Sequence, residues 1–166
     1  MPFEPALLKQ VEALLAQCRA GGLKIATAES CTGGLVSGCL TEIAGSSDVF
    51  ERGFVTYSND AKTQLLGVPA AVIAQHGAVS EIVARLMAEG AVFRSEADIA
   101  VAITGIAGPG GGSAEKPVGL VHFAAHRRGG QTILRAERLG DIGRTPIRTA
   151  SLQIALDLLA QAAQAK

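Results

Sequence analysis

The first third of the chain shows a helical period, then a strand, then a second helix. Apolar residues recur three or four positions apart from residue 7 to residue 18, and the pair Gly21-Gly22 supplies a stop. The run LKIATAE at 23–29 has the length of a strand and leads into the polar sequence SCT. Small apolar residues from Gly33 to about Ile43 predict a helix that can pack closely on a sheet.

The middle third predicts a strand and three helices. RGFVTYS at 52–58 has the composition of a strand, and Asn59 is a suitable N-cap for a short helix that Gly67 ends. A second short helix is expected at 68–77, and Ser80 followed by Glu81 begins a longer one. We expect the inward face of this longer helix to consist of Ile82, Val83, Leu86, Met87 and Phe93.

The last third predicts a buried strand, a glycine-rich loop, a hairpin and a final helix. DIAVAIT at 98–104 is almost wholly apolar, as in strands that are covered on both faces. VGLVHFAAHR and TILRAERL form the hairpin around Gly129-Gly130, and Thr145-Pro146 supplies the N-cap and first residue of the last helix. The inward residues of that helix are expected to be Ile147, Ala150, Ile154, Leu158 and Leu159. Alternating helices and strands predict the α/β class, as a three-layer α/β/α sandwich with a mixed, mostly parallel sheet, in a single domain over 1–166.

Composition narrows the classes of function. Hydrophobic residues make up 48% of the 166 residues, which favours one packed domain. Fifteen basic residues balance fifteen acidic ones, and the chain has no Trp and a single Tyr. We therefore expect no nucleic-acid partner, because such a partner needs a basic surface and single-stranded bases need aromatic platforms. The arginines crowded into the last third are interpreted, as a set, as solvated hairpin and helix faces.

From the sequence we expect neither an export signal nor a membrane span. Its first residues, MPFEPALLKQ, lack the basic segment and long apolar segment of a signal peptide. No uncharged apolar run approaches the roughly 18 residues that a membrane span requires. Cys18, Cys31 and Cys39 are odd in number and lack zinc-ligand spacing, so we expect a reduced, cytoplasmic protein with neither a metal nor another cofactor.

The strand at 23–29 ends in a corner that carries two nucleophiles, Ser30 and Cys31, followed by Thr32, Gly33 and Gly34. Glycines let a ligand approach the backbone, and the amides that open a helix favour negative charge, including the oxyanion formed if Ser30 attacked a carbonyl. A tight turn with Ser or Thr as an N-cap explains the same residues equally well.

Lys62 is the best candidate base for a serine nucleophile. It lies in the first turns of a predicted helix, where the helix dipole disfavours an ammonium, and burial would lower its pKa further. A solvated surface lysine is the alternative. His76, His122 and His126 fit core or surface positions better than a catalytic one. Tyr57, the single tyrosine, either packs at the sheet edge or aims its hydroxyl at the site.

The long loop after residue 104 has the composition of an anion-binding nest. Its amides could bind a phosphate with Thr104 and Ser113 as hydroxyl donors, while Lys116 either adds charge or lies at the rim. The glycines concerned are Gly105, Gly108, Gly110, Gly111 and Gly112. Together with Ser30, this loop predicts a site for a phosphorylated small molecule.

Four segments, TAESCTGG, GSSDVFERGFVTYSNDAK, GVP…AQHGAVSEIVA and TGIAGPGGGSAEKPVG, resemble the CinA C-terminal domain family, in order, from about residue 5 to residue 160. The resemblance implies an α/β/α fold and hydrolysis of nicotinamide mononucleotide to nicotinic acid mononucleotide and ammonia, in pyridine nucleotide salvage. The family's competence and damage-inducible label comes from genetic context. A homo-oligomer is also expected, since the helices are apolar and rich in alanine.

By the same resemblance, Ser30 is the nucleophile, Lys62 its base, and Tyr57 lies nearby. Thr32, Gly33, Gly34, Thr104 and the glycine loop, including Gly105, Gly108, Gly110 and Ser113, would hold the nucleotide. Arg144 and Arg148 keep the family's four-residue separation and could meet a phosphate, although Ile142-Gly143 look inserted after Asp141. Gly110 stands where many relatives have Asp.

Three alternatives stay open from the sequence. Cys31 rivals Ser30 as the nucleophile. A non-catalytic nucleotide-binding module, linked to competence or the DNA-damage response, would keep the glycine loops and arginines but would not need Ser30 or Lys62. Direct DNA binding is the weakest, because the chain is neutral and poor in aromatic residues.

Overall fold

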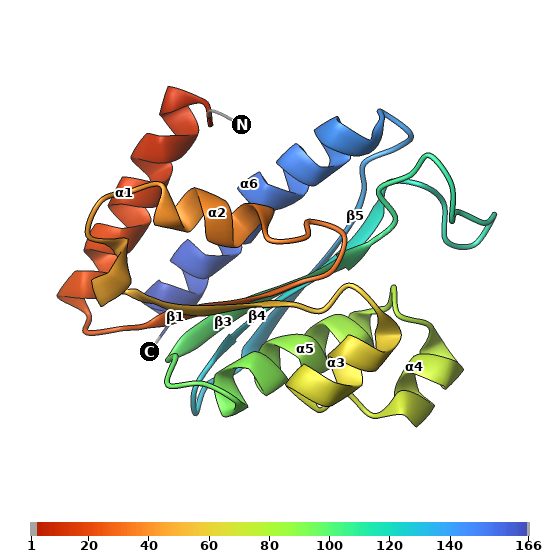
Figure 1. Ribbon diagram of the computed structural model, residues 1–166, viewed down its shortest axis with the longest axis horizontal. Helices are drawn as coiled ribbons and strands as arrows, with labels where there is room; N and C mark the ends of the chain where they lie inside the picture. Colours follow the sequence, from red (N-terminus) through yellow and green to blue (C-terminus); the bar gives the residue numbers. More distant parts are fainter. Residues whose placement is uncertain (1–2, 166) are drawn as a thin grey trace.

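The computed structural model describes residues 3–165, and it arranges them as three layers around one sheet (Figure 1). Helices α1, α2 and α6 cover one face of the sheet, and helices α3, α4 and α5 cover the other (Figure 1). In chain order the elements are α1 (Pro5–Ala20), β1 (Ile25–Glu29), α2 (Leu35–Thr41), the short 3-10 helix η1 (Ser46–Asp48), β2 (Phe50–Val55), α3 (Asn59–Leu66), α4 (Ala70–His76), α5 (Glu81–Phe93), β3 (Ile99–Gly105), β4 (Leu120–Arg127), β5 (Thr132–Arg138) and α6 (Arg144–Gln164).

The five strands are ordered β2-β1-β3-β4-β5. Strand β1 pairs in parallel with both β2 and β3, whereas β4 is antiparallel to its neighbours β3 and β5. Four of the five strands therefore run in one direction, which confirms the predicted α/β/α sandwich with a mixed, mostly parallel sheet. The single domain over 1–166 stays a prediction, and residues 1, 2 and 166 lie outside the described residues.

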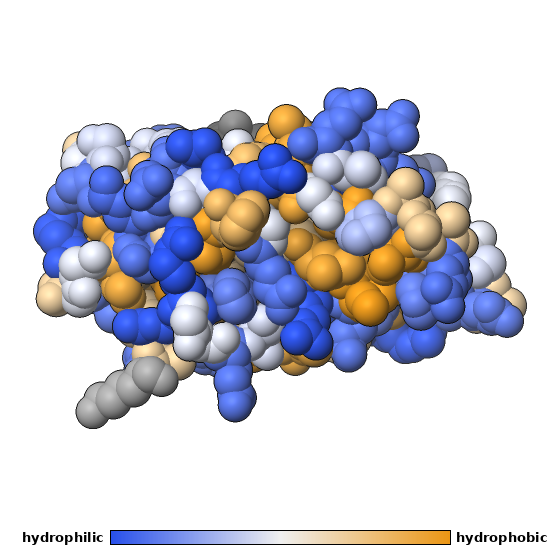
Figure 2. Space-filling model, turned by 90° about the horizontal axis from the view of Figure 1, so that it is seen from below, coloured by the Kyte–Doolittle hydropathy of each residue, from blue (hydrophilic) through white to orange (hydrophobic). Residues whose placement is uncertain are grey.

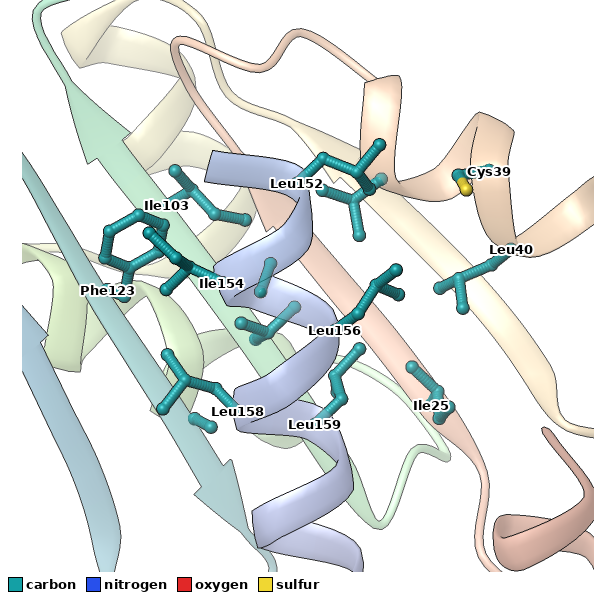
Figure 3. Close-up of a cluster of buried hydrophobic side chains, with 14 of the residues drawn as sticks. Ile25, Cys39, Leu40, Ile103, Phe123, Leu152, Ile154, Leu156, Leu158 and Leu159 are labelled. Atoms are coloured by element: carbon teal, nitrogen blue, oxygen red, sulfur yellow. The ribbon is translucent and has the colours of Figure 1, made fainter. Parts of the chain in front are cut away.

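The two faces of the central strands differ in side-chain size. Alternate residues of a strand point to opposite faces. Toward α6 the sheet presents branched residues and one aromatic ring, which pack on the leucines of α6 (Figure 3). Those sheet residues are Ile25, Ile99, Val101, Ile103, Val121 and Phe123. Toward α5 the same strands present mainly alanine, namely Ala26, Ala28, Ala100, Ala102 and Ala124. This small-residue face allows α5 to lie close to the sheet.

The predicted inward face of α5 is wrong at two positions. Phe93 is 80% exposed and Ile82 is 39% exposed. The helix instead buries Val83, Ala84, Met87, Ala88, Ala91 and Val92. Because the opposing sheet face consists of alanine, the helix approaches it through its own alanines, and this rotation carries the ring of Phe93 to the surface.

Other boundaries differ by one to three residues. Strand β2 ends at Val55, so Tyr57 lies beyond the strand rather than at its end. The N-cap of α3 is Ser58, whose Oγ accepts a hydrogen bond from the Ala61 amide at 3.1 Å, while the predicted cap, Asn59, is the first helical residue. Helix α6 begins at Arg144, one residue before the predicted Thr145 cap, because Gly143 adopts a positive φ of 95° there. Within residues 3–165, no helix combines the length and hydropathy needed to cross a bilayer.

Candidate active site

The polar corners predicted from the sequence meet at one edge of the sheet. Strands β1, β2 and β3 are parallel, so their carboxyl ends lie at the same edge, where α/β proteins bind their ligands. A cavity of about 280 Å³ opens there. Its wall consists of Ser30, Cys31, Tyr57, Asn59, Lys62, Ala78, Val79, Thr104, Gly105, Ile106, Ala107, Gly108, Gly110, Gly111 and Arg144.

The central feature of this wall is a contact between Ser30 and Lys62. Lys62 Nζ lies 3.1 Å from Ser30 Oγ, although the residues are 32 positions apart. The pleat of β1 explains this pairing: Glu29 faces α2, so the next residue turns toward the opposite layer, where α3 supplies Lys62. Nζ also lies 2.9 Å from the Thr56 carbonyl oxygen and 3.5 Å from that of Ser58.

Lys62 has the electrostatic environment of a base. The residue is only 1% exposed, and burial lowers the pKa of its amine below the ordinary value, opposed in part by Cys31. A neutral amine carries two hydrogens and one lone pair. The hydrogens can be donated to the carbonyls of Thr56 and Ser58, which leaves the lone pair free to accept the proton of the Ser30 hydroxyl. The surface-lysine alternative is therefore wrong.

Cys31 has the opposite character from an activated nucleophile. The residue is 6% exposed, and burial raises the pKa of its thiol to about 11. The reactive species of cysteine is the thiolate, so at neutral pH Cys31 is present almost entirely in its unreactive form. Between the two adjacent nucleophiles, this electrostatic difference favours Ser30.

We predict that Cys31→Ala keeps the turnover of the natural substrate within about fivefold of wild type, because an inert thiol contributes packing rather than chemistry. The measurement is kcat of the purified variant, together with a melting curve to confirm folding. Loss of activity in a folded Cys31→Ala, with activity retained in Ser30→Ala, would exchange the roles of the two residues.

Glu29, which the sequence analysis passed over, organises the turn that presents Ser30. Its side chain is fully buried and accepts hydrogen bonds from the amides of Gly34, Val36 and Ser37 at 3.0, 3.1 and 2.8 Å, and from Ser37 Oγ at 2.8 Å. A carboxylate at the positive end of α2 is the favourable sign of charge. This contact corrects the expectation that the first amides of this helix are free to hold an oxyanion.

Replacing Glu29 with Gln is expected to lower the free energy of unfolding by about 3 kcal/mol, because the variant loses charge-assisted bonds and turns an NH2 group toward amide donors. Urea unfolding measures this change. The matched variant Ser37→Ala removes only the hydroxyl donor and should cost about 1 kcal/mol. Equal stabilities of Glu29→Gln and wild type would show that the carboxylate does not hold the turn.

Arg148 holds the same turn from the other side. Its Nε and Nη2 donate to the carbonyl oxygens of Cys31 and Thr32, at 3.1 and 2.8 Å. The amides of Gly33 and Leu35 donate to the carbonyl oxygens of Ser30 and Thr32. Among residues 3–165 no oxygen atom accepts from the amides of Cys31 and Thr32, although the Cys31 amide lies near its own thiol, and of these two residues only Cys31 lines the cavity. The Cys31 amide is therefore the available oxyanion donor at this corner.

The glycine-rich loop closes the cavity opposite Ser30. Gly108 has a φ of +75°, and a Cβ there would lie 2.7 Å from the Val118 side chain, so the position requires glycine. Residues 3–165 supply no acceptor for the amides of five loop residues, which can therefore bind an anion. These residues are Ala107, Gly108, Gly110, Gly111 and Gly112. Thr104 is 1% exposed and donates to the Ala78 carbonyl at 2.8 Å.

Arg144 links the loop to Tyr57 across the cavity. Its Nη1 donates to the Gly108 carbonyl at 3.0 Å, and its Nη2 donates to the Tyr57 hydroxyl at 3.0 Å. Tyr57 is 59% exposed, so its ring lies at the mouth of the cavity rather than in the core. The side chain of Arg144 thus places a positive charge on the wall that also carries four of the five loop residues with free amides, Ala107, Gly108, Gly110 and Gly111.

The structure gathers most, but not all, of the predicted site residues. Ser30, Lys62, Tyr57, Thr104, Gly105, Gly108, Gly110 and Arg144 line the cavity. Thr32, Gly33, Gly34, Ser113 and Arg148 do not lie on its wall. The hydroxyl of Ser113 accepts from the Lys116 amide, and Lys116 Nζ donates to the His76 carbonyl, which ties the loop to α4. Sequence reasoning missed Asn59 as a wall residue, because its position suggested only a cap.

The three-layer fold and the cavity at the strand ends define a class of protein. Comparison with known sequences identifies the family. The family model described as "CinA C-terminal domain" matches residues 8–163. The chain therefore belongs to this family. This confirms the resemblance found in the sequence motifs.

Three relatives illustrate the range of the family. The nicotinamide-nucleotide amidohydrolase PncC of Escherichia coli K12 is 59% identical over 119 residues, which cover 72% of each chain. A CinA-like protein of Mycobacterium sp. strain JLS is 55% identical over 156 residues, 93% of this chain but 35% of that protein. The chain thus spans about a third of the length of this relative. The competence/damage inducible protein CihA from Agrobacterium tumefaciens superposes with a TM-score of 0.96 at 52% identity, covering 99% of both chains.

Proposed function

We propose that this protein hydrolyses nicotinamide mononucleotide to nicotinic acid mononucleotide and ammonia, with Ser30 as nucleophile and Lys62 as base. The observation that carries the proposal is the 3.1 Å contact between Lys62 Nζ and Ser30 Oγ, made by a buried lysine whose pKa is lowered. The similarity to the E. coli amidohydrolase supports the choice of substrate. A role in pyridine nucleotide salvage in a reduced cytoplasm, by a homo-oligomer, belongs to the same proposal.

The first half-reaction forms an ester. The lone pair of Lys62 takes the hydroxyl proton as Ser30 Oγ attacks the carboxamide carbon, and the carbonyl oxygen becomes an oxyanion. The free Cys31 amide donates to that oxyanion. The Lys62 ammonium then gives its proton to the nitrogen, the C–N bond breaks, and ammonia leaves the acyl-enzyme.

The second half-reaction returns the enzyme to its starting state. Lys62, neutral again, removes a proton from water as the water oxygen attacks the ester carbonyl. The C–O bond to Ser30 then breaks, Lys62 returns the proton to Oγ, and the carboxylate product is released. Lys62 therefore serves as base and acid in each half-reaction, which requires a pKa closer to neutrality than that of a solvated lysine.

The nucleotide part of the substrate is assigned to the opposite wall. Arg144 and the free amides of the glycine loop suit a phosphate, because a fixed guanidinium and backbone N–H groups without an acceptor both favour anions. Arg148 is occupied by the carbonyls of Cys31 and Thr32, so we assign it to positioning the turn rather than to the phosphate.

The experiment compares three amides, namely nicotinamide mononucleotide, nicotinamide riboside and nicotinamide, by ammonia release from the purified protein. We expect the mononucleotide to be favoured in kcat/KM by at least about 100-fold, since only it carries the phosphate. In Arg144→Met this preference should fall by about tenfold or more. A rise in melting temperature with the mononucleotide but no ammonia from any amide would instead support the non-catalytic binding module.

A further inference from the structure

A second cavity, of about 520 Å³, opens on the layer formed by α3 and α5. It lies between the carboxyl-terminal ends of these two helices and the turn that follows β4, and it shares no wall residue with the candidate active site. Its volume is within the usual range of small-molecule sites. Figure 2 views this side of the protein and shows apolar side chains gathered in patches between charged ones.

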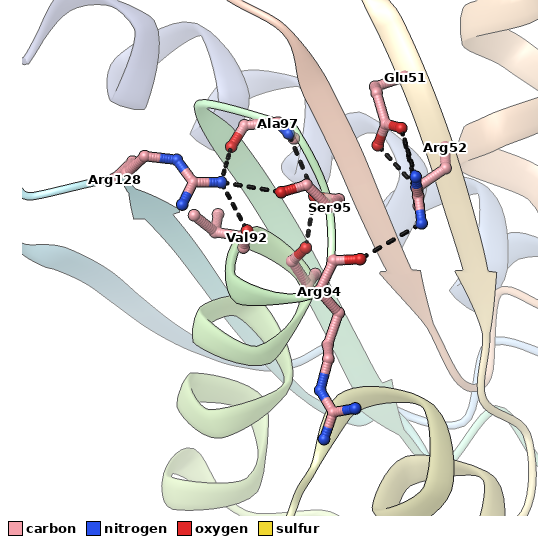
Figure 4. A network of polar contacts seen from close by, with 8 residues as sticks. Glu51, Arg52, Val92, Arg94, Ser95, Ala97 and Arg128 are labelled. Carbon is pink, nitrogen blue, oxygen red and sulfur yellow. Dashed lines mark hydrogen bonds and ion pairs between the residues drawn. The ribbon is translucent and has the colours of Figure 1, made fainter.

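Two guanidinium groups line this cavity, and neither has a carboxylate partner. Arg128 Nη2 lies 2.7, 2.9 and 2.8 Å from the carbonyl oxygens of Val92, Ser95 and Ala97, which fixes the side chain at the end of α5 (Figure 4). The guanidinium of Arg94 points away from that network toward α3 and has no hydrogen-bond or ion-pair partner among residues 3–165 (Figure 4).

The one carboxylate on the wall, that of Glu89, is already bound by two residues that do not line the cavity. Glu89 Oε1 accepts from Arg85 Nε at 2.8 Å and from Thr132 Oγ1 at 3.2 Å. Arg85 does not line the cavity, so the charge of Glu89 is paired by a residue outside the wall. The wall therefore presents two positive charges to a ligand, with the negative charge of Glu89 paired by a third arginine.

Apart from His126, whose Nδ1 lies 2.9 Å from Thr132 Oγ1, apolar groups and glycines form the remainder of the wall. Leu66, Leu86 and Val92 line the cavity, and the ring of Phe93 stands beside them with 80% of its surface exposed. The walls are held together by a close approach of the two helices, because a Cβ at Gly90 would lie 2.1 Å from the Leu66 carbonyl oxygen. A preformed cavity that combines unpaired guanidinium groups with aliphatic and aromatic side chains suits a ligand with the same two properties.

We propose that this cavity is a binding site for a small organic anion, in which a carboxylate or phosphate is joined to an aromatic or branched apolar body. The anionic group would bind the guanidinium of Arg94, with the charge of Arg128 on the same wall adding to the attraction, and the apolar body would cover Leu86 and Phe93. The site is separate from the hydrolysis proposed for Ser30, and it does not depend on that proposal.

The test is a titration of isotopically labelled protein with phenyl phosphate, benzoate and inorganic phosphate, followed by NMR. Three glycines on this wall, Gly67, Gly90 and Gly129, report on the cavity, whereas Gly111 reports on the active site. We expect phenyl phosphate and benzoate to shift the three cavity glycines with saturation. Inorganic phosphate should bind there at least about tenfold more weakly, because it lacks the apolar body.

Two variants distinguish binding in this cavity from nonspecific electrostatic attraction to the protein surface. Arg94→Ala should weaken phenyl phosphate binding at the cavity about tenfold, because a charge-assisted contact is lost. Arg135→Ala removes the same charge from an exposed pair with Glu137 on β5, and it should leave the affinity unchanged. Unsaturated shifts at the three glycines, equal affinity for inorganic and phenyl phosphate, or equal losses in the two variants would overturn the proposal.

Discussion

Ser30→Ala is expected to lower kcat for ammonia release from nicotinamide mononucleotide by about three orders of magnitude or more. The variant removes the hydroxyl that we propose forms the ester, and the adjacent Cys31 thiol, with a pKa of about 11, should not replace it. Binding should survive, because the loop amides and Arg144 are unchanged. We would measure ammonia under saturating substrate, and the rise in melting temperature that the substrate produces.

Cys31→Ala is the matched control, because it removes the adjacent nucleophile from the same wall. We expect near-normal turnover in this variant and almost none in Ser30→Ala, with both proteins folded. If Ser30→Ala releases ammonia at a rate close to that of wild type, Ser30 is not the nucleophile.

Lys62→Met should lower kcat/KM by about a thousandfold, because the reaction loses its base and its acid together. In the wild type, kcat/KM should rise with pH as Lys62 loses its proton, with an inflection below the ordinary lysine value of 10.5. The exposed Lys9→Met on α1 serves as the control for loss of a lysine charge, and it should behave as wild type. A wild-type profile without this inflection would contradict the role of Lys62 as base.

The lowered pKa of Lys62 also predicts that the free energy of unfolding depends on pH. Burial lowers the pKa of folded Lys62, so between that pKa and 10.5 the unfolded chain binds more protons than the folded one. The free energy of unfolding of the wild type should therefore rise with pH across this window, relative to Lys62→Met. Urea unfolding of both proteins at neutral pH and near pH 10 measures the change. A difference that stays constant, or changes in the opposite direction, would show that the Lys62 pKa is not lowered.

The fold was predictable because each element has a local signal. The buried strand at 98–104, the glycines that end helices and the Ser80 cap all depend on nearby residues. The pairing of Ser30 with Lys62 could also be predicted. The two residues follow β1 and β2, and the carboxyl ends of these parallel strands lie at the same edge of the sheet. The rotation of each helix against the sheet could not be predicted in this way, because it depends on the sizes of the side chains that meet between the layers.

The contacts of Glu29 and the exposure of Phe93 were not predicted from the sequence. A carboxylate at the end of a strand that leads into a helix is a signal for a cap, but six intervening residues hid the connection to Val36. Phe93 was assigned inward on helical periodicity, yet the alanine face of the sheet turned α5 until the ring was exposed. Arg148 likewise supports the turn at Cys31, a contact across 117 residues that no local pattern reveals.

A single assay of both reaction products decides whether this chain is an amidohydrolase that acts through Ser30. Purified wild type and Ser30→Ala are incubated with nicotinamide mononucleotide, and ammonia and nicotinic acid mononucleotide are both quantified. We expect equal amounts of the two products from the wild type, formed catalytically, and at most about a thousandth of that rate from the folded variant. No product from a folded wild type, or equal rates from both proteins, would contradict this expectation.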